Sequence, residues 1–282
     1  MTIRRAAVAG SWYPGTAQAL ARAVDRHLAT TSRDAGGELV ALIAPHAGLI
    51  YSGPVAAHAY RLLRGRRFDV AILVGPSHFV GFDGVALYPA GGFETPFGVA
   101  GIDDATGQAV RDASPAVRED RSVHTREHSL EMQLPFLQRV AAETKIVPLL
   151  MGYQTAETAR ALGDALAAAL RGRRALLIAS TDLSHYHDAS VAAQLDAIVI
   201  DHVAKFDADG LQGALDAQPD HACGGGPTVA VMRAARLLGA RDALVLNYAD
   251  SGDVSGDKSA VVGYLAAAFG TFDEASGSEC IV

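Results

Sequence analysis

Two histidines follow apolar, strand-like runs at a small-residue break, and this shared position points to shared chemistry. In LIAPHAGLIYSG the apolar run ends at Pro45 and His46 comes next. In VAILVGPSHFVGF a similar run is followed by His78. Neutral imidazole is a preferred ligand of transition metals such as zinc, copper and iron. We therefore expect both to bind one metal ion; the alternative is two loop histidines bonded to nearby backbone.

The segment STDLSHYH, which follows a third apolar run, suits proton transfer. Asp182 and His185 are three residues apart, so a turn or the first coil of a helix brings them to the same side. A nearby carboxylate orients an imidazole and raises its pKa, which suits a general acid/base or a group that positions a ligand. The alternative is an N-cap, in which Ser180, Thr181 or Asp182 caps a short helix.

The segment CGGGP places Cys223 directly before three glycines and an expected helix. Backbone N–H groups at a helix N-terminus favour an anion or a thiolate. Cys223 is therefore a candidate metal ligand or nucleophile, and the alternative is a small buried hydrophobic residue. The glycines do not form a Walker A loop, because no Gly-Lys-Ser/Thr follows them.

The segment HTREHSLEMQLPFL matches the H-x-x-E-H inverzincin pattern through His124, Glu127 and His128. Two histidines four apart on a helix could bind zinc, with the glutamate as base. The alternative is an amphipathic helix with an apolar leucine stripe, in which His128 and Glu131 lie at the polar margin.

Short apolar runs alternate with helical patterns along the chain. The runs are mostly continuous, which is typical of strands buried on both faces. We expect strands at 39–44, 70–74, 85–88, 146–150, 175–179, 243–247 and 260–264. We expect helices at 54–63, 104–113, 129–143, 156–170, 191–203 and 228–238, with an irregular or hairpin segment at 88–102.

This alternation predicts a single three-layer α/β domain over residues 1–270, with a mostly parallel or mixed central sheet flanked by helices. Residues 271–282 are expected to form a flexible tail. In open α/β sheets, binding sites form at the carboxyl ends of the strands. Because His46, His78 and the Asp182 segment all follow strands, we expect them to meet at that edge.

Composition argues against several classes of protein. The 282 residues carry 24 basic and 31 acidic side chains, without a basic stripe interleaved with aromatics, so we expect no nucleic-acid partner. The two cysteines, Cys223 and Cys280, do not suggest a disulfide framework and indicate a reducing, cytoplasmic location. The sequence does not predict a signal peptide, because the N-terminus has two arginines but no apolar h-region of useful length. It does not predict a membrane span either, because it has no run of about 18 apolar residues.

Nine motifs extend in order over nearly the whole chain: GSWYP, APHAGLIYSGPVAAHAY, GPSHF, TPFG, EHSLEMQLPFL, KIVPLLMG, STDLSHY, CGGGP and GDKSAVVGYLA. Together they resemble the Memo family, also called AmmeMemoRadiSam system protein B. The resemblance implies a fold like that of the class III extradiol ring-cleavage dioxygenases (LigB-like), which are non-haem iron enzymes. It also implies a functional link to radical-SAM and AMMECR-type proteins.

The resemblance assigns a metal, iron or copper, to His46, His78 and Cys223. It places Asp182 and His185 beside that metal as catalytic residues. We expect Fe(II) first, with Cu or Zn as alternatives. A carboxylate occupies the position of Cys223 in the dioxygenases, and thiolate changes the electronic properties of the metal. Ring opening therefore does not follow from the resemblance.

The same motifs contain Tyr51, His128 and Glu131, which we expect to contact the substrate. The Memo motif includes His128 but not His124, which weakens the inverzincin interpretation. We expect a metal-binding protein that acts as a mononuclear non-haem iron or copper redox enzyme, dioxygenase-like, on an unidentified substrate. One alternative is a non-catalytic metal- or peptide-binding scaffold, and a second is a zinc hydrolase. The ligand would be a small molecule or peptide, and a homodimer is left open.

Overall fold

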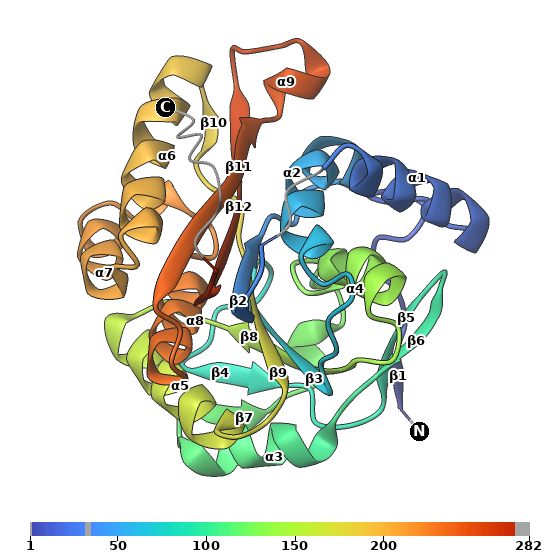
Figure 1. Cartoon of the computed structure of the whole chain (residues 1–282), viewed down its shortest axis with the longest axis vertical. Coiled ribbons are helices and arrows are strands. Elements are labelled where there is room, and N and C mark those ends of the chain that lie inside the picture. Colours follow the sequence, from blue (N-terminus) through green and yellow to red (C-terminus); the bar gives the residue numbers. More distant parts are fainter. Residues whose placement is uncertain (1, 32–34, 274–282) are drawn as a thin grey trace.

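The computed structural model describes residues 2–31 and 35–273, and its centre is a nine-stranded mixed sheet (Figure 1). Strands β2, β9, β3 and β8 lie side by side and run parallel. The remaining strands extend the sheet in the order β10-β12-β2-β9-β3-β8-β4-β7, and β11 pairs with β12. The expected α/β class with a mixed central sheet is confirmed.

The strands of this sheet are β2 (Glu38–Ala44), β3 (Val70–Pro76), β4 (Val85–Leu87), β7 (Val117–Glu119), β8 (Lys145–Met151), β9 (Ala175–Ser180), β10 (His185–His187), β11 (Asp242–Asp250) and β12 (Val261–Thr271). A smaller sheet consists of β1 (Ile3–Arg4), β5 (Gly92–Thr95) and β6 (Gly98–Gly101). Because β5 and β6 pair antiparallel, the segment 88–102 contains the hairpin that its sequence suggested.

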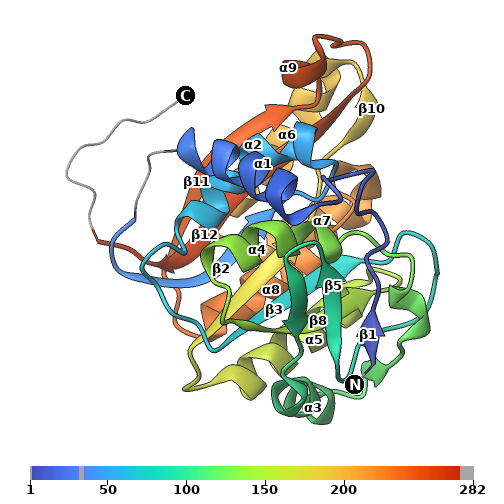
Figure 2. The same ribbon diagram turned by 90° about the vertical axis from the view of Figure 1, so that its right-hand side faces the viewer.

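Helices cover both faces of the large sheet, since its strands alternate between two apolar cores. One core packs β-strand residues such as Ile72 against α3 (Asp104–Ala113), α5 (Ala156–Leu170), α6 (Ala189–Ala204), α7 (Ala208–Ala217) and α8 (Gly225–Leu237). The other packs residues such as Leu73 against α1 (Ala17–Ala29), α2 (Leu49–Arg61) and α4 (Leu134–Val140). This period-two division of β3 produces the three layers. The short α9 (Gly252–Ser255) lies at the tip of the β11–β12 hairpin (Figure 2).

Several predicted boundaries were wrong. α2 begins at Leu49, so Pro54 lies inside the helix instead of starting it. The helix expected at 129–143 is a 3-10 turn, η2 (Glu131–Gln133), followed by the seven-residue α4. The helices α1 and α7 were not predicted. The predicted tail 271–282 lies outside the described residues from 274 onward, and β12 includes Thr271.

Parallel pairing places the segments that follow β2, β3 and β9 at one edge of the sheet. Ala44 is opposite Ser180, and Val74 is opposite Ala179, so the three strands end together. The loops that carry His46 and His78 therefore emerge beside the segment that carries Asp182. Within the described ranges, no helix has the length and apolar character needed to cross a membrane.

Candidate metal centre

His46 follows β2 and has one ring nitrogen fully committed to a buried network. Its Nδ1 lies 2.9 Å from Ser180 Oγ. That hydroxyl donates to the Ser129 carbonyl (2.7 Å) and accepts a hydrogen bond from Gln133 Nε2 (2.7 Å). Because the hydroxyl proton is already used, His46 Nδ1 must donate, and the lone pair of the neutral ring lies on Nε2. The network thus selects the tautomer that a metal ligand requires.

His78 follows β3 and is oriented by a buried carboxylate. Its Nδ1 lies 2.9 Å from Glu127 Oε1, and its backbone N–H donates to Oε2 (2.6 Å). The amides of His128 and Ser129 donate to the same carboxylate, each at 2.9 Å. Burial alone would raise the pKa of Glu127, but the hydrogen bonds from His78 and Ser129 lower it to about 2. The ionised carboxylate therefore holds Nδ1–H of His78 and leaves Nε2 available.

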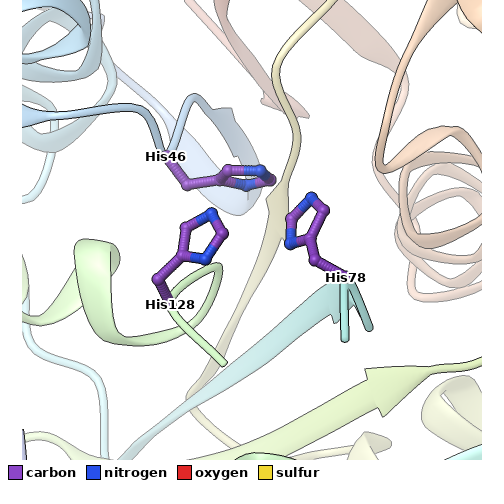
Figure 3. A group of neighbouring side chains, drawn as sticks. All are labelled: His46, His78 and His128. Carbon is purple, nitrogen blue, oxygen red and sulfur yellow. The ribbon is translucent and has the colours of Figure 1, made fainter. Parts of the chain in front are cut away.

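His128 completes a group of three histidines, whose rings Figure 3 shows turned towards a common space. One ligand atom from each of His46, His78 and His128 lies within 4.8 Å of the others. The rings of His78 and His128 stack, with centroids 4.6 Å apart. The Trp12 ring also packs against the His128 ring, with centroids 4.2 Å apart. Three convergent imidazoles form a donor set suited to zinc, copper or iron.

Burial keeps two of these imidazoles neutral at pH 7. Desolvation, with the neighbouring His78 and His128 rings, lowers the pKa of His46 well below its ordinary value. Desolvation also lowers the pKa of His128 to about 4, and the nearby Glu127 only partly opposes it. A metal would therefore not compete with bound protons at these two rings near neutral pH.

Cys223 lies against this group on the His46 side. Its Sγ is 3.2 Å from His46 Nε2, the nitrogen that the Ser180 network leaves free. Burial and the nearby Asp182 carboxyl raise the pKa of the thiol above its ordinary value. Sulfur and nitrogen that share one ion lie roughly 3–3.6 Å apart for metal distances near 2.3 and 2.0 Å. The observed contact fits a common ligand position, in which the metal replaces the thiol proton.

Hydrogen bonds from two neighbouring segments hold the loop that contains Cys223. Its backbone N–H donates to the Asp182 carbonyl (3.2 Å), and the Asp182 N–H donates to Sγ (3.2 Å). Gln154 donates from Nε2 to the Cys223 carbonyl (2.7 Å) and accepts from the Gly226 amide (2.8 Å). These bonds connect the loop to the segments that follow β9 and β8. The position of the thiol is therefore fixed by the surrounding structure.

The two predicted catalytic residues lie beside the candidate metal centre. Asp182 Oδ1 accepts the His46 backbone N–H (2.7 Å), and burial raises the pKa of this carboxyl to about 7. His185 donates Nδ1–H to the Leu183 carbonyl (2.8 Å), which leaves a lone pair on Nε2. Burial lowers the pKa of His185, and His78 is close enough to lower it further.

The three predicted substrate contacts lie in different places. His128 belongs to the histidine group described above. Tyr51 is 41% exposed on α2, in the turn that follows the His46 loop. Glu131 is 0% exposed and binds the N-terminal segment, so no surface of its carboxylate is open to a substrate.

The carboxylate of Glu131 instead forms what we call the Glu131 clamp. It accepts hydrogen bonds from Arg4 (2.5 Å), the Tyr13 hydroxyl (2.7 Å) and the amides of Ala7 (2.7 Å) and Val8 (3.0 Å). Arg4 also donates from Nε to the His124 carbonyl (2.6 Å). This cluster gives Glu131 an architectural role that its position on an expected helix margin did not suggest.

The inverzincin interpretation is not supported by the geometry. The 3-10 turn η1 (Ser122–His124) ends at His124, and the chain is not helical between His124 and His128. The His124 ring points elsewhere: its Nε2 lies 3.1 Å from the Ala86 carbonyl, beside Tyr88. Burial lowers the pKa of His124 to about 4.

Sequence reasoning missed the partners that orient the ligands. Glu127 was considered as a base on a zinc helix, whereas it orients His78, a residue 49 positions away. Ser180 was considered as an N-cap, whereas its hydroxyl orients His46. Gln133 and Gln154 were not singled out at all. The motifs EHSLEMQ and STDLSH contain three of these residues, but no spacing rule connects them to their distant partners.

Comparisons with known proteins found relatives that match nearly the whole chain. The family described as Memo-like protein matches residues 4–268. MEMO1 family protein MTH_45 from Methanothermobacter thermautotrophicus is 40% identical over 272 residues, covering 93% of this chain and 98% of the relative. A MEMO1 family protein from Nitrosopumilus maritimus is 35% identical over 274 residues, covering 95% of this chain and 99% of the relative.

A solved structure supports the fold alone. The crystal structure of the uncharacterized protein JW3007 from Escherichia coli K12 superposes with a TM-score of 0.54 at 15% identity. The match covers 80% of this chain and 99% of that chain.

Proposed function

The chain belongs to the Memo-like protein family, and from that premise we propose that it is a mononuclear metal-dependent redox enzyme. His46, His78 and Cys223 are the proposed ligands, and His128 lines the substrate side of the same centre. The observation that carries the proposal is the convergence of His46, His78 and His128 beside a thiol 3.2 Å from His46 Nε2.

The donor set favours a metal that accepts both imidazole and thiolate. Iron(II) is our first assignment, with copper or zinc as alternatives. A bound iron or copper ion would supply one-electron chemistry to a small substrate at this edge of the sheet. The protein contributes fixed ligands, because Ser180 and Glu127 already hold both histidines in the required tautomer.

The residues beside the ligands would manage protons. His185 is the proposed acid/base, since its Nδ1–H is held by the Leu183 carbonyl and Nε2 can accept a proton. Asp182 carries a carboxyl whose pKa is about 7, so it can exchange a proton near neutral pH. It also accepts the His46 amide, which fixes the loop of that ligand.

A binding role without turnover is the second candidate, and exposed aromatic side chains favour it. Phe79 is 51% exposed and Trp12 is 38% exposed, and both contact the His128 ring. Aromatic surfaces at the mouth of a site suit a peptide or a planar small molecule. A homodimer, a cytoplasmic location and a link to radical-SAM and AMMECR-type proteins stay predictions.

Metal analysis tests the proposal. Protein purified without oxygen and without a chelating tag should contain about one iron ion per chain. His46→Ala and Cys223→Ser should each lower metal affinity by roughly tenfold or more, since even changes to groups behind the ligands commonly cost that much. His128→Ala should retain the metal and weaken substrate binding.

His202→Ala is the matched control, because His202, on α6, pairs with Asp207 at the N-terminus of α7 and with none of the proposed ligands. Equal metal content in wild type, His46→Ala and Cys223→Ser would contradict the ligand assignment. Loss of metal in His128→Ala together with retention in Cys223→Ser would replace the thiol by a third histidine. Stoichiometric zinc instead of iron would support the hydrolase alternative.

A further inference from the structure

One buried carboxylate lies near the candidate metal centre without belonging to it. Asp196, on α6, is 0% exposed, and burial raises the pKa of its carboxyl. A buried carboxylate costs free energy unless hydrogen bonds compensate it, so its partners indicate its role. The Ser184 backbone N–H donates to Oδ1 (2.9 Å), and the Tyr248 hydroxyl donates to Oδ2 (2.8 Å).

Strand β12 holds the same stretch of backbone. The Gly263 N–H donates to the Ser184 carbonyl (3.0 Å), and the Leu183 N–H donates to the Gly263 carbonyl (2.8 Å). A Cβ at position 263 would lie 1.9 Å from Asp196 Oδ2, so only glycine admits the carboxylate. The motif GDKSAVVGYLA therefore contains a glycine whose absent side chain makes room for Asp196.

The ring of His185 depends on this stretch of backbone. The Leu183 carbonyl accepts its Nδ1–H, and that carbonyl can stay in place only while residues 183 and 184 are held. Directly afterwards, Tyr186 has a φ of 62°, which is costly for an aromatic residue and persists only where the surroundings enforce it. The pairing of β10 with β12 is also irregular between His185 and His187. The strained φ of Tyr186 and the irregular pairing both call for backbone held in place just before them.

We propose that Asp196, together with the Tyr248 hydroxyl, is a positioning residue for His185. The carboxylate holds the Ser184 amide and so keeps the Leu183 carbonyl where it selects the Nδ1–H tautomer of the ring. The consequence for catalysis rests on the proposed function, in which His185 is the acid/base. The positioning itself requires no metal and is measured without turnover.

The test measures the tautomer of His185 by long-range ¹H–¹⁵N NMR of the imidazole nitrogens. The His185→Gln variant identifies the signal. Wild type should show the Nδ1–H form. Asp196→Asn replaces the charged acceptor of the Ser184 amide with a neutral one, and Tyr248→Phe removes the hydrogen bond that holds the carboxylate. Both variants should shift the ring towards a mixture of tautomers, because hydrogen bonds to a charged group change a conformational equilibrium by about tenfold.

Tyr13→Phe is the matched control, since it also removes a tyrosine hydroxyl that donates to a buried carboxylate, that of Glu131 (2.7 Å). It should leave the His185 signal unchanged. An unchanged His185 signal in Asp196→Asn and Tyr248→Phe would overturn the proposal and reduce Asp196 to a structural role. If Asp196→Asn does not fold, Tyr248→Phe alone decides by the same criterion.

Failure of the proposed function has a different signature. If His185→Gln retained full turnover, the acid/base role would be wrong, while a changed tautomer in Tyr248→Phe would still establish the positioning. Metal content should be the same in wild type, Asp196→Asn and Tyr248→Phe, because neither residue contacts a proposed ligand.

Discussion

Two buried glutamates four residues apart, Glu127 and Glu131, are the centres of two different regions. Glu131 is paired with a permanent cation, Arg4, and with hydrogen-bond donors from the N-terminal segment. Glu127 is paired with the imidazole of His78 and with backbone amides. Both carboxylates are almost completely buried, so burial does not distinguish their roles.

The chemistry of the partner does distinguish them. Arginine stays protonated and has no lone pair, so Arg4 in the Glu131 clamp has no free atom that could bind a metal. Histidine bonded through Nδ1–H keeps a lone pair on Nε2, so the Glu127 pair still has a ligand position to offer. The comparison teaches that a buried carboxylate indicates a functional site when its partner keeps a free lone pair near other potential ligands. Here that lone pair is on Nε2 of His78, and the neighbours are His46 and His128.

The largest expected effect concerns stability and comes from the clamp. Glu131→Ala leaves the Arg4 guanidinium buried without its counterion, and breaking a buried ion pair in this way costs about 3–5 kcal/mol. The free energy of unfolding, measured by urea denaturation, should fall by that amount. The exposed Glu143→Ala serves as control and should change it by less than about 0.5 kcal/mol. A loss no larger than the control would mean that the clamp does not stabilise the fold.

An intermediate effect is expected at the metal centre. Glu127→Gln keeps the volume of the side chain but removes the charge that holds His78 Nδ1–H. Metal affinity, measured by competition with a chelator, should fall by roughly 10- to 100-fold. Stability should fall less than in Glu131→Ala, because no permanent cation is left unpaired. The opposite pattern, a large loss of stability with unchanged metal affinity, would make the two glutamates equivalent.

The smallest expected effect is a pH dependence at the boundary of the clamp. The pKa of His124 is about 4 in the folded chain, below the ordinary value of about 6.5. The unfolded chain therefore binds more protons between these values, and stability falls as the pH decreases from about 6.5 towards 4. Between pH 7 and pH 5, the free energy of unfolding of His124→Gln should fall by about 2 kcal/mol less than that of the wild type.

The pH comparison is made within each variant, so any change in stability at pH 7 cancels. An equal loss in His124→Gln and wild type would show that the His124 ring is not kept neutral by the fold.

The sequence alone was sufficient for the main architecture and for the proximity of His46 and His78. Continuous apolar runs predicted the buried parallel strands, because such strands have no solvent-facing side. His46 and His78 could be paired because the carboxyl ends of parallel strands meet at one edge of a sheet. The ordered motifs then predicted the family, and the matches over residues 4–268 confirm it.

Only the tertiary structure decided what lies around those ligands. The segment from His124 to Gln133 has no continuous helix, so its spacing could not indicate which side chains share a face. Its path sends Glu127 and His128 to the candidate metal centre, and His124 and Glu131 into the interior. Local patterns follow from backbone periodicity, whereas hydrogen bonds such as Glu127 to His78 depend on how distant loops pack, and no periodicity in the chain records that packing.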